Sequence, residues 1–280
     1  MKSTHAQGVA LVCISAIAFS TAGLFTKGVS ADAWSVIFWR GVSAAVFTLV
    51  YALLRGDFRR EWHGFGAAAW GSTLLSVSGT AAFIPAFKLT SIANVALIWA
   101  SAPFVTALLA WVLLKERPSQ RVLLASCVAI IGVFVVVSGS FGGGTLLGDA
   151  LAFWMTLMIA GIMVLYRRFP QTPVLLPNAL ASVILLPVAL WFTAPLQVIS
   201  MELLLLLVFG VVFALASVTF TMGARILPPT EAALLSALET PLAPIWAFLL
   251  LSEIPTWAAA IGGAMIMGAL IWSQMRGRAA

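Results

Sequence analysis

Charged residues are scarce in this chain: 24 of its 280 residues, or 9%, carry a formal charge. A soluble domain has about 25%. Hydrophobic residues make up 62% of the chain, and so few charges cannot cover a water-facing surface, so the composition excludes a soluble enzyme. Cysteine is just as scarce. Cys13 and Cys127 lie in apolar runs, without the spacing of a disulfide framework or a metal site.

Motifs for catalysis and ion conduction are missing as well. His5 and His63 fall in terminal or loop positions, so no histidine relay or metal site lies within an apolar run. The chain has no GxxxxGKS or GxxxxGKT phosphate loop, no paired carboxylates at helical spacing, and no ring of charges that would line an ion filter. We therefore expect neither an enzyme nor a channel, and no metal or cofactor.

Long apolar stretches dominate what is present. A helix crosses a bilayer core of about 30 Å with about 20 apolar residues. Ten stretches of this kind cover residues 8–27, 34–54, 66–86, 91–113, 122–140, 147–167, 174–194, 201–223, 230–251 and 257–275. The gaps between them leave no room for a soluble domain. The sequence therefore predicts an all-α membrane protein with ten transmembrane helices.

The net charge of +6 and the pI near 10.0 would indicate a nucleic acid partner only if the basic residues formed one patch. Instead they fall in alternate gaps: with the N-terminus inside, 12 of the 15 basic residues lie in inside segments. The exceptions are Lys27, Arg40 and Lys88. Because cytoplasmic loops are enriched in lysine and arginine, both termini are predicted to be cytoplasmic, and no nucleic acid partner is expected.

The two halves of the chain match each other weakly, in four places and in the same order. The matching segments are residues 8–11 and 148–151, Gly71 and Gly210, Pro103 and Pro241, and residues 113–118 and 250–255. We therefore divide the chain into a first repeat, 1–144, and a second, 145–280. Each repeat holds an odd number of spans, so the second enters the membrane from the opposite side. Inverted repeats around a central cavity are typical of secondary transporters that work by alternating access, although duplication also produces passive or enzymatic membrane proteins.

Proline interrupts the fourth and ninth spans near their middle, at Pro103 and Pro241. A proline within a helix leaves the carbonyl four residues earlier without its hydrogen bond, here the carbonyls of Trp99 and Ala237. In a membrane such a carbonyl has to face a cavity or another helix. The sequence therefore predicts one kinked helix in each repeat, which is a hinge, a cavity wall or a static kink.

Two charges inside the predicted spans need a reason. Glu239 lies about 12 Å into the ninth span, where a carboxylate is costly unless it is protonated, paired or facing water. It is interpreted as a contact for a substrate amine, a proton-coupling site or a protonated packing residue. Arg40, near the outer end of the second span, either pairs with Glu239, snorkels outward or holds a substrate carboxylate. Glu116 and Glu253 close their helices, and we expect them to be caps or partners in loop ion pairs.

The other polar and aromatic residues at membrane depth are mostly neutral, and we expect them to line the cavity together with Glu239. The candidate lining residues are Phe19, Ser20, Thr21, Ser78, Thr80, Trp99, Ser101, Trp154, Met158, Ser217, Phe220, Ser236 and Glu239. Serine and threonine also pack helices together in membranes, and the aromatic residues equally suit a packed core. A lining of this kind suits a small amphipathic substrate rather than a phosphorylated one.

Several short segments resemble, in their order and spacing, the drug/metabolite transporter superfamily in its ten-helix bacterial branch with two EamA-type repeats. The segments are residues 20–24, Arg40, residues 91–97, 101–103 and 113–117 in the first half, and residues 148–149, 238–241 and 250–253 in the second. The start of the first helix and the length are similar to the aromatic amino acid exporter subgroup. Members of that subgroup often carry aromatic residues at the positions of Phe19, Gly79 and Ala102, and the departures at Gly79 and Ala102 suggest a broader amino acid range.

The resemblance implies an exporter of the bacterial inner membrane whose two halves rock around a cavity built by helices 1, 3, 4, 6, 8 and 9. The motif residues that it carries over are Arg40, Pro103, Glu116, Glu239, Pro241 and Glu253. We expect export of small amphipathic metabolites, most of all amino acids, by a monomer in the lipid bilayer. The alternatives are an exporter of drugs and other toxic compounds, a membrane-embedded enzyme, and a non-transporting subunit that associates through Gly262, Gly263 and Gly268.

Overall fold

A computed structural model of the chain describes residues 2–56, 58–139, 145–224, 226, 235–236 and 238–274. The helices are α1 (Lys2–Ser20), α2 (Ala22–Lys27), α3 (Ala33–Leu54), α4 (Phe58–His63), α5 (Ala67–Leu89), α6 (Ile92–Ala100), α7 (Ala102–Leu114), α8 (Gln120–Ser138), α9 (Leu146–Arg168), α10 (Leu175–Phe192), the 3-10 helix η1 (Pro195–Gln197), α11 (Ser200–Ala224), α13 (Glu239–Leu251) and α14 (Trp257–Gln274). The described residues contain no strand, so the prediction of an all-α fold is confirmed.

The predicted spans reappear as helices to within a few residues. Eight helical segments of the described chain are long and apolar enough to cross a membrane, and α13 and α14 add two shorter apolar helices. Two of the eight consist of consecutive helices, α1 with α2 and α6 with α7. The ninth predicted span is described as a continuous helix only from Glu239 on, since residues 230–234 and 237 lie outside the described residues. The fold is that of a multi-pass membrane protein.

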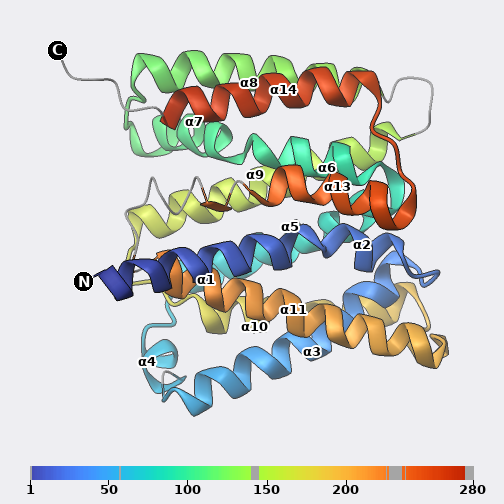
Figure 1. Ribbon diagram of the computed structural model, residues 1–280. Coiled ribbons are helices and arrows are strands. Elements are labelled where there is room, and N and C mark those ends of the chain that lie inside the picture. The colour runs from blue at the N-terminus through green and yellow to red at the C-terminus, as the bar shows by residue number, and fades with distance from the viewer. Residues whose placement is uncertain are drawn as a thin grey trace.

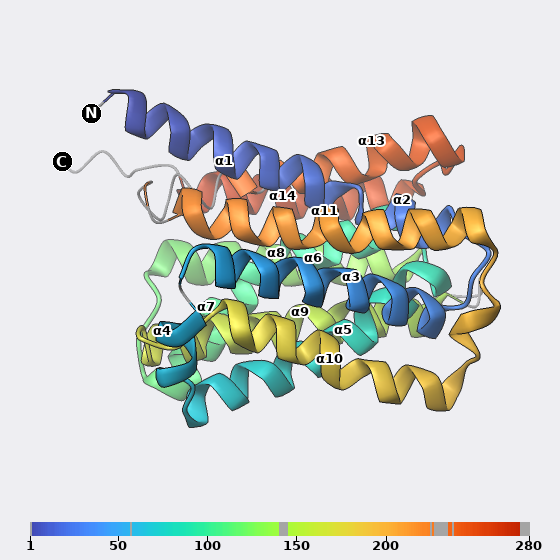
Figure 2. The same cartoon turned by 90° about the horizontal axis from the view of Figure 1, so that it is seen from below.

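The helices run side by side along one common direction (Figures 1 and 2). The start of α1 and the end of α14 lie at the same end of the bundle, which we call the terminal end (Figure 1). Basic residues of the described chain gather there: Arg55, Arg59, Arg60, Lys115, Arg117, Arg121, Arg167 and Arg168. Lys27 and Lys88, in contrast, lie in the last turns of α2 and α5, at the opposite end. Basic residues from alternate loops of the sequence thus gather at one end of the bundle.

Helices of the first half pack against helices of the second. The close pairs are α1 with α11, α3 with α10, α5 with α9, α6 with α13, and α8 with α14. Exchanging the two halves, span by span, turns the α1–α11 pair into the α9–α5 pair and leaves the other three pairs unchanged. This exchange symmetry is the pattern expected of two inverted repeats.

The first crossing breaks at Thr21, between α1 and α2. The hydroxyls of Ser20 and Thr21 donate hydrogen bonds to backbone carbonyls one turn earlier, at 2.7 and 2.6 Å. Such bonds compete with the helical ladder and often bend a helix. A Cβ on Gly23 would lie 2.9 Å from the Ile92 side chain, so the glycine that follows the break lets α2 approach α6 closely.

The fourth crossing breaks at Ser101, two residues before Pro103. Pro103 lies in the first turn of α7, where backbone N–H groups have no partner within the helix, so the proline removes no further hydrogen bond. The Ser101 hydroxyl donates to the carbonyl of Ile98 at 2.7 Å and closes α6. Pro241 likewise lies in the first turn of α13, while the carbonyl of Ala237 falls outside the described residues. Each proline thus lies in the first turn of a described helix, and its role as a hinge, cavity wall or static kink stays a prediction.

Asp32 caps the N-terminus of α3 and joins it to the second half. Its carboxylate accepts hydrogen bonds from the backbone N–H groups of Trp34 and Ser35, at 2.8 and 3.1 Å. It also accepts from the hydroxyls of Ser35 and Thr193, each at 2.7 Å. Burial raises the pKa of Asp32, but the hydrogen bonds from Ser35, Thr193 and Trp34 outweigh it and hold the pKa below its ordinary value.

Replacing Asp32 with alanine is expected to lower the free energy of unfolding by about 1 kcal/mol at neutral pH, the usual loss for an N-cap. The folded-state pKa lies below the unfolded value of about 3.9. The stabilisation is therefore fully present above the unfolded value and disappears as the pH falls through the folded one. Thermal unfolding in detergent should show a gap between wild type and variant at neutral pH that closes in acid. A gap that stays constant down to the lowest pH would contradict this role.

Helices α8 and α14 approach each other at two glycines. A Cβ on Gly262 would lie 2.5 Å from the carbonyl oxygen of Gly132, and one on Gly132 would lie 2.9 Å from the carbonyl oxygen of Gly262. A Cβ on Gly263 would meet the side chain of Leu97 at 2.8 Å. Gly262 and Gly263 therefore pack within the chain, whereas Gly268 has no neighbouring atom within 4 Å of such a Cβ.

Replacing Gly262 with alanine is expected to destabilise the protein by about 1–3 kcal/mol, because the new methyl group meets backbone atoms that cannot move aside. Gly268→Ala, in the same helix, is the matched control. It should leave stability unchanged or raise it by up to about 1 kcal/mol through helix propensity. Thermal unfolding of both variants in detergent tests the difference, and equal behaviour of the two would show that α8 and α14 do not pack as described.

Candidate substrate site

The break of the first crossing brings Ser20 against the second half. Its hydroxyl oxygen accepts a hydrogen bond from the indole Nε1 of Trp246 in α13, at 3.0 Å. Trp246 was missed by the sequence prediction, although it follows Glu239 by seven residues and so lies on the same face of α13. The bond ties the end of α1 to α13, at the edge of the region where the predicted lining residues gather.

Trp99 and Glu239 meet where α6 ends and α13 begins. The Trp99 side chain is the hydrogen-bonding partner of the Glu239 carboxyl group. Both residues are half-buried, and α6 packs against α13. The two residues that the sequence places beside the two prolines thus come together from opposite halves. A carboxyl group next to an indole, at two helix ends, can bind a cation or an ammonium group.

Helices α5 and α9 bring a second set of predicted residues together. The indole Nε1 of Trp154 donates a hydrogen bond to the hydroxyl of Ser78, at 3.0 Å. On the same seam, a Cβ on Gly79 would lie 3.3 Å from the Cβ of Met158. Trp154 is 46% exposed, so its indole is held by Ser78 without being enclosed in a core.

A third set follows one face of α11. Phe213, Ser217 and Phe220 are spaced four and three residues apart, which places them on the same side of the helix. The Phe213 ring meets Phe19 of α1 edge to face, with the ring centroids 5.4 Å apart. The Ser217 hydroxyl donates to the carbonyl of Phe213 at 3.1 Å. Phe220 packs against Val12 of α1, so aromatic residues line the seam between α1 and α11.

The remaining predicted lining residues are Thr21, Thr80, Ser101 and Ser236. Thr21 and Ser101 donate their hydroxyls to carbonyls of the helices that they end, and both mark breaks. Thr80 is half-buried in α5, and Ser236 is half-buried in the short described piece 235–236. The structure brings together Ser20 with Trp246, Trp99 with Glu239, Ser78 with Trp154, and Phe19 with Phe213.

Arg40 lies inside the bundle on α3. It is 3% exposed, so of its three expected roles the one in which it snorkels to the outer surface is not seen here. Its guanidinium carbon stands 4.5 Å from the centre of the Phe213 ring and 5.5 Å from that of Phe209. Over the residues that the structure describes, no carboxylate forms an ion pair with it, so the pairing with Glu239 is not seen.

Two ion pairs connect the halves, one at each end of the bundle. Lys27 Nζ lies 2.7 Å from an oxygen of Glu253 at the end opposite the termini. Arg167 Nη2 lies 2.6 Å from an oxygen of Glu116 at the terminal end. The repeat offset of 140 to 137 residues relates Lys27 to Arg167 and Glu116 to Glu253. The expectation of loop ion pairs for the two glutamates is confirmed, and the two pairs are the same interaction formed twice.

The backbone repeats itself at the same places. Lys115 and Ser252 directly precede the two glutamates, and both are left-handed, with φ of 58° and 53°. Their N–H groups bond to the carbonyls of Ala110 and Ala247 and close α7 and α13. Residues other than glycine rarely adopt this conformation. Its presence at both related positions supports the division into two repeats.

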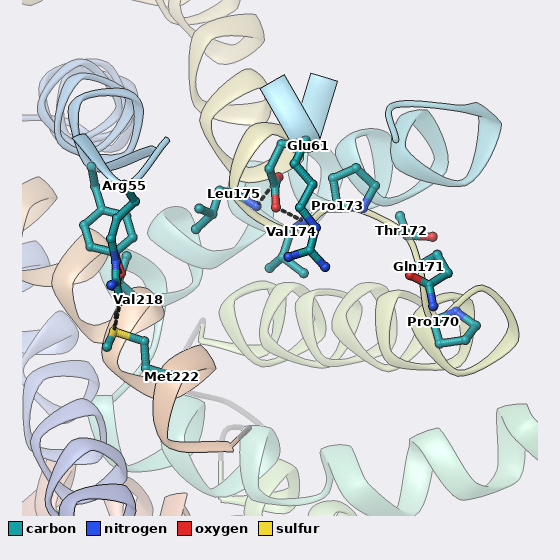
Figure 3. A pocket seen from close by; sticks show the side chains of 12 residues that line it. Arg55, Glu61, Pro170, Gln171, Thr172, Pro173, Val174, Leu175, Val218 and Met222 are labelled. Carbon is teal, nitrogen blue, oxygen red and sulfur yellow. Dashed lines mark hydrogen bonds between the residues drawn. The ribbon is translucent and has the colours of Figure 1, made fainter. Parts of the chain in front are cut away.

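A pocket of about 160 Å³ opens at the terminal end, as Figure 3 shows. It is lined by Tyr51, Arg55, Arg60, Glu61, Pro170, Gln171, Thr172, Pro173, Val174, Leu175, Val218 and Met222. The Glu61 carboxylate accepts hydrogen bonds from the backbone N–H groups of Leu175 and Leu176, at 2.9 and 3.0 Å, and so caps α10 from outside. The predicted cavity residues do not line this pocket within the described chain. Its acidic group serves to hold α4 against α10.

Asp149 is a buried carboxylate that the sequence pattern marked only as part of the repeat. It accepts hydrogen bonds from the Thr90 hydroxyl at 2.6 Å and from the Asn94 side-chain amide at 3.1 Å. A Cβ on Gly148 would lie 2.7 Å from the backbone nitrogen of Thr90. The start of α9 is thus docked onto the turn between α5 and α6. Nowhere in the described chain do three His, Cys, Asp or Glu side chains gather as a metal site.

The family profile and the curated relative that this chain matches are both those of transporters. Residues 6–138 match the profile of the EamA-like transporter family. The "Uncharacterized transporter YyaM" of Bacillus subtilis (strain 168) is 28% identical over 215 residues, which cover 72% of this chain and 68% of that protein. A solved structure described as "Crystal structure of protein" covers 100% of this chain and 99% of its own, with a TM-score of 0.66 at 18% identity.

The matches agree with the resemblance to EamA-type transporters, and with the expectation that the chain is not an enzyme. At 18% identity the solved structure shows the fold alone, and it shows it over the whole length. The likeness to the aromatic amino acid exporter subgroup stays a prediction.

Proposed function

We propose that this protein is a secondary transporter of the EamA type that exports small zwitterionic metabolites, most of all amino acids, across the bacterial inner membrane. The terminal end of the bundle faces the cytoplasm, because it carries most of the described basic residues. The observation that carries the proposal is the pair of repeat-related ion pairs, Lys27 with Glu253 and Arg167 with Glu116, at opposite ends.

These two ion pairs, which we call latches because each holds the two halves together at one end, suit alternating access. When two related halves exchange conformations, the contacts at one end take the place of those at the other. Release of the Arg167–Glu116 pair opens the cytoplasmic end, and release of the Lys27–Glu253 pair opens the outer end. Both pairs are formed in the structure, which therefore resembles a state closed at both ends.

The residues between the latches favour a small amphipathic substrate. The hydroxyls of Ser20 and Ser78 and the indoles of Trp246 and Trp154 form two neutral polar contacts between the halves. Beside them stands one carboxyl group, that of Glu239. Neutral polar groups next to aromatic faces bind a molecule with a small charged head and an apolar side chain. We infer a range of amino acids broader than the aromatic ones, handled by a monomer.

Purified protein in liposomes loaded with labelled amino acids tests the proposal. Efflux of at least one of threonine, methionine, leucine or phenylalanine should exceed that from loaded liposomes without the protein. Absence of efflux for the whole panel, with and without a pH gradient, would overturn it. Glu116→Gln together with Arg167→Gln, which removes one latch, should change the rate in the same liposomes.

A second candidate is a broad exporter of lipophilic cations. The contact between the Glu239 carboxyl group and the Trp99 indole favours it, because a carboxylate and an aromatic face together attract organic cations. Cells that express the protein would then resist cationic dyes, and Glu239→Gln would abolish the resistance while amino acid efflux continued. Dye resistance that survives in the variant would exclude this candidate.

A further inference from the structure

Arg40 is a buried cation, and among the described residues two of its three guanidinium nitrogens have no hydrogen-bond partner. It stands about 12 Å into α3, counted from the cap at Asp32. Its Nε and Nη1 atoms are buried and have no hydrogen-bond partner. A guanidinium group has five N–H donors arranged in a plane, and unpaired donors are costly in a low-dielectric interior. A bound molecule with a hydrogen-bond acceptor can therefore satisfy the unpaired Nε and Nη1 donors of Arg40.

The aromatic rings around Arg40 stabilise its charge but offer no hydrogen-bond acceptor to its Nε and Nη1 atoms. Phe209 and Phe213 place their faces near the guanidinium carbon, at 5.5 and 4.5 Å. Phe25 stacks on Phe209, with the centroids 5.2 Å apart, and Phe19 contacts Phe213. A cation and an aromatic face attract each other through the ring quadrupole, while the N–H groups point along the guanidinium plane. The arrangement holds a positive charge ready for a planar acceptor.

The carboxylates at the outer end of the bundle are engaged elsewhere. Asp32 caps its own helix and binds Thr193. Glu202 accepts the backbone N–H groups of Ser30 and Ala31. Glu253 binds Lys27 and the N–H of Ile92. Each of these groups would have to give up existing bonds to neutralise Arg40, so a ligand from outside is the better source of negative charge.

The position of Arg40 is fixed by close packing of α3 on α11. A Cβ on Gly210 would collide with the Ser43 hydroxyl and with the backbone carbonyl of Arg40 itself. The same α11 face continues through Phe213 to Ser217 and Phe220. Arg40 therefore adjoins the seam of predicted lining residues and is separated from it by the ring of Phe213.

We propose that Arg40 is the subsite for the carboxylate group of the transported substrate. The inference rests on the proposed function and adds to it the group that is recognised. A carboxylate offers two oxygens in a plane, which match the guanidinium fork in a bidentate pair. Movement of Phe213 with α11, as the halves rock, brings the substrate and the guanidinium together. Lysine at this position retains the charge but not the fork.

The test compares threonine, methionine, leucine and phenylalanine with their carboxamides, as competitors of labelled amino acid efflux from liposomes. The amides keep the side chain and the ammonium group but lack the carboxylate. Wild type should prefer each transported amino acid over its amide by tenfold or more. Arg40→Gln should abolish that preference, and Arg40→Lys should reduce it.

Lys88→Gln is the matched control, because Lys88 is a half-buried cation whose ammonium group already donates to the carbonyl of Val29, at 2.6 Å. It should retain the full preference. Equal competition by acids and amides in wild type overturns the carboxylate subsite, and this comparison needs no variant to fold. Unchanged preference in Arg40→Gln overturns it too. Amino acid efflux in either case leaves the proposed function standing, whereas no efflux of any amino acid in wild type overturns both.

Discussion

Replacing Glu253 with glutamine is expected to lower the free energy of unfolding by about 1.5–3 kcal/mol, the range for hydrogen bonds to charged groups. One carboxylate oxygen binds Lys27 at 2.7 Å, and the other accepts the backbone N–H of Ile92 at 2.5 Å. Their side chains are 25% exposed for Lys27 and 17% for Glu253, so water replaces these bonds poorly. Glutamine leaves the ammonium group unpaired. Thermal unfolding, followed by the fluorescence of the 11 tryptophans, measures the loss.

Glu116→Gln is the matched control, since Glu116 is the repeat partner of Glu253. Its pair with Arg167 is much more exposed, at 65% for Arg167 and 44% for Glu116. Exposed pairs contribute only about 0–1 kcal/mol, so this variant should unfold close to wild type. Exchanging the charges in Lys27→Glu with Glu253→Lys should recover part of the lost stability. An equal loss in Glu116→Gln and Glu253→Gln would contradict the difference in burial.

Replacing Glu239 with glutamine is expected to remove the pH dependence of transport and to slow efflux about tenfold, the effect of losing an interaction of about 1.4 kcal/mol. The carboxyl group lies at the start of α13 beside Trp99, at membrane depth. A carboxylate there is costly unless it is protonated or paired. Under the proposed function, a proton and the ammonium group of the substrate compete for it. Glutamine retains the shape and the bond to the indole but cannot take up a proton.

Efflux from liposomes measured across a range of internal pH checks this expectation. Glu61→Gln serves as control, because this carboxylate caps α10, belongs to neither latch and does not contact the predicted lining residues of the described chain, so the variant should leave the pH profile unchanged. A Glu239→Gln protein that folds and keeps the wild-type profile would remove Glu239 from the coupling mechanism. The position would then be a packing or binding residue only.

Most of the fold could be predicted from sequence because the membrane imposes simple conditions. Every backbone polar group in lipid must bond within its own segment, so long apolar runs predict helices with small errors at the ends. That Glu116 and Glu253 each form an ion pair could also be predicted from sequence, since charged residues at helix ends have few other partners. Pro103 was placed correctly near a break, but the break itself depends on where a new helix starts.

The contacts that make the site were less accessible, because they join residues far apart in sequence. Trp246 reaches Ser20 across 226 positions, and Thr90 reaches Asp149 across 59. Snorkelling was one of three roles considered for Arg40, because the residue lies near a helix end. It stays inside because Gly210 lets α11 approach closely enough to cover it with aromatic rings. The residues next to Arg40 in the sequence do not indicate that α11 packs over it.

Because the two latches differ in exposure, added salt is expected to weaken the Arg167–Glu116 pair much more than the Lys27–Glu253 pair. The screening length falls from about 8 Å at physiological ionic strength to about 3 Å at 1 M, and exposed pairs are screened far more than buried ones. Salt added to the compartment that faces Arg167 and Glu116 therefore weakens that latch, whereas salt in the other compartment leaves Lys27 and Glu253 nearly intact. Under the proposed alternating access, a liposome with different salt on its two faces is therefore expected to favour one opening, and the face that responds reports which way the protein has inserted.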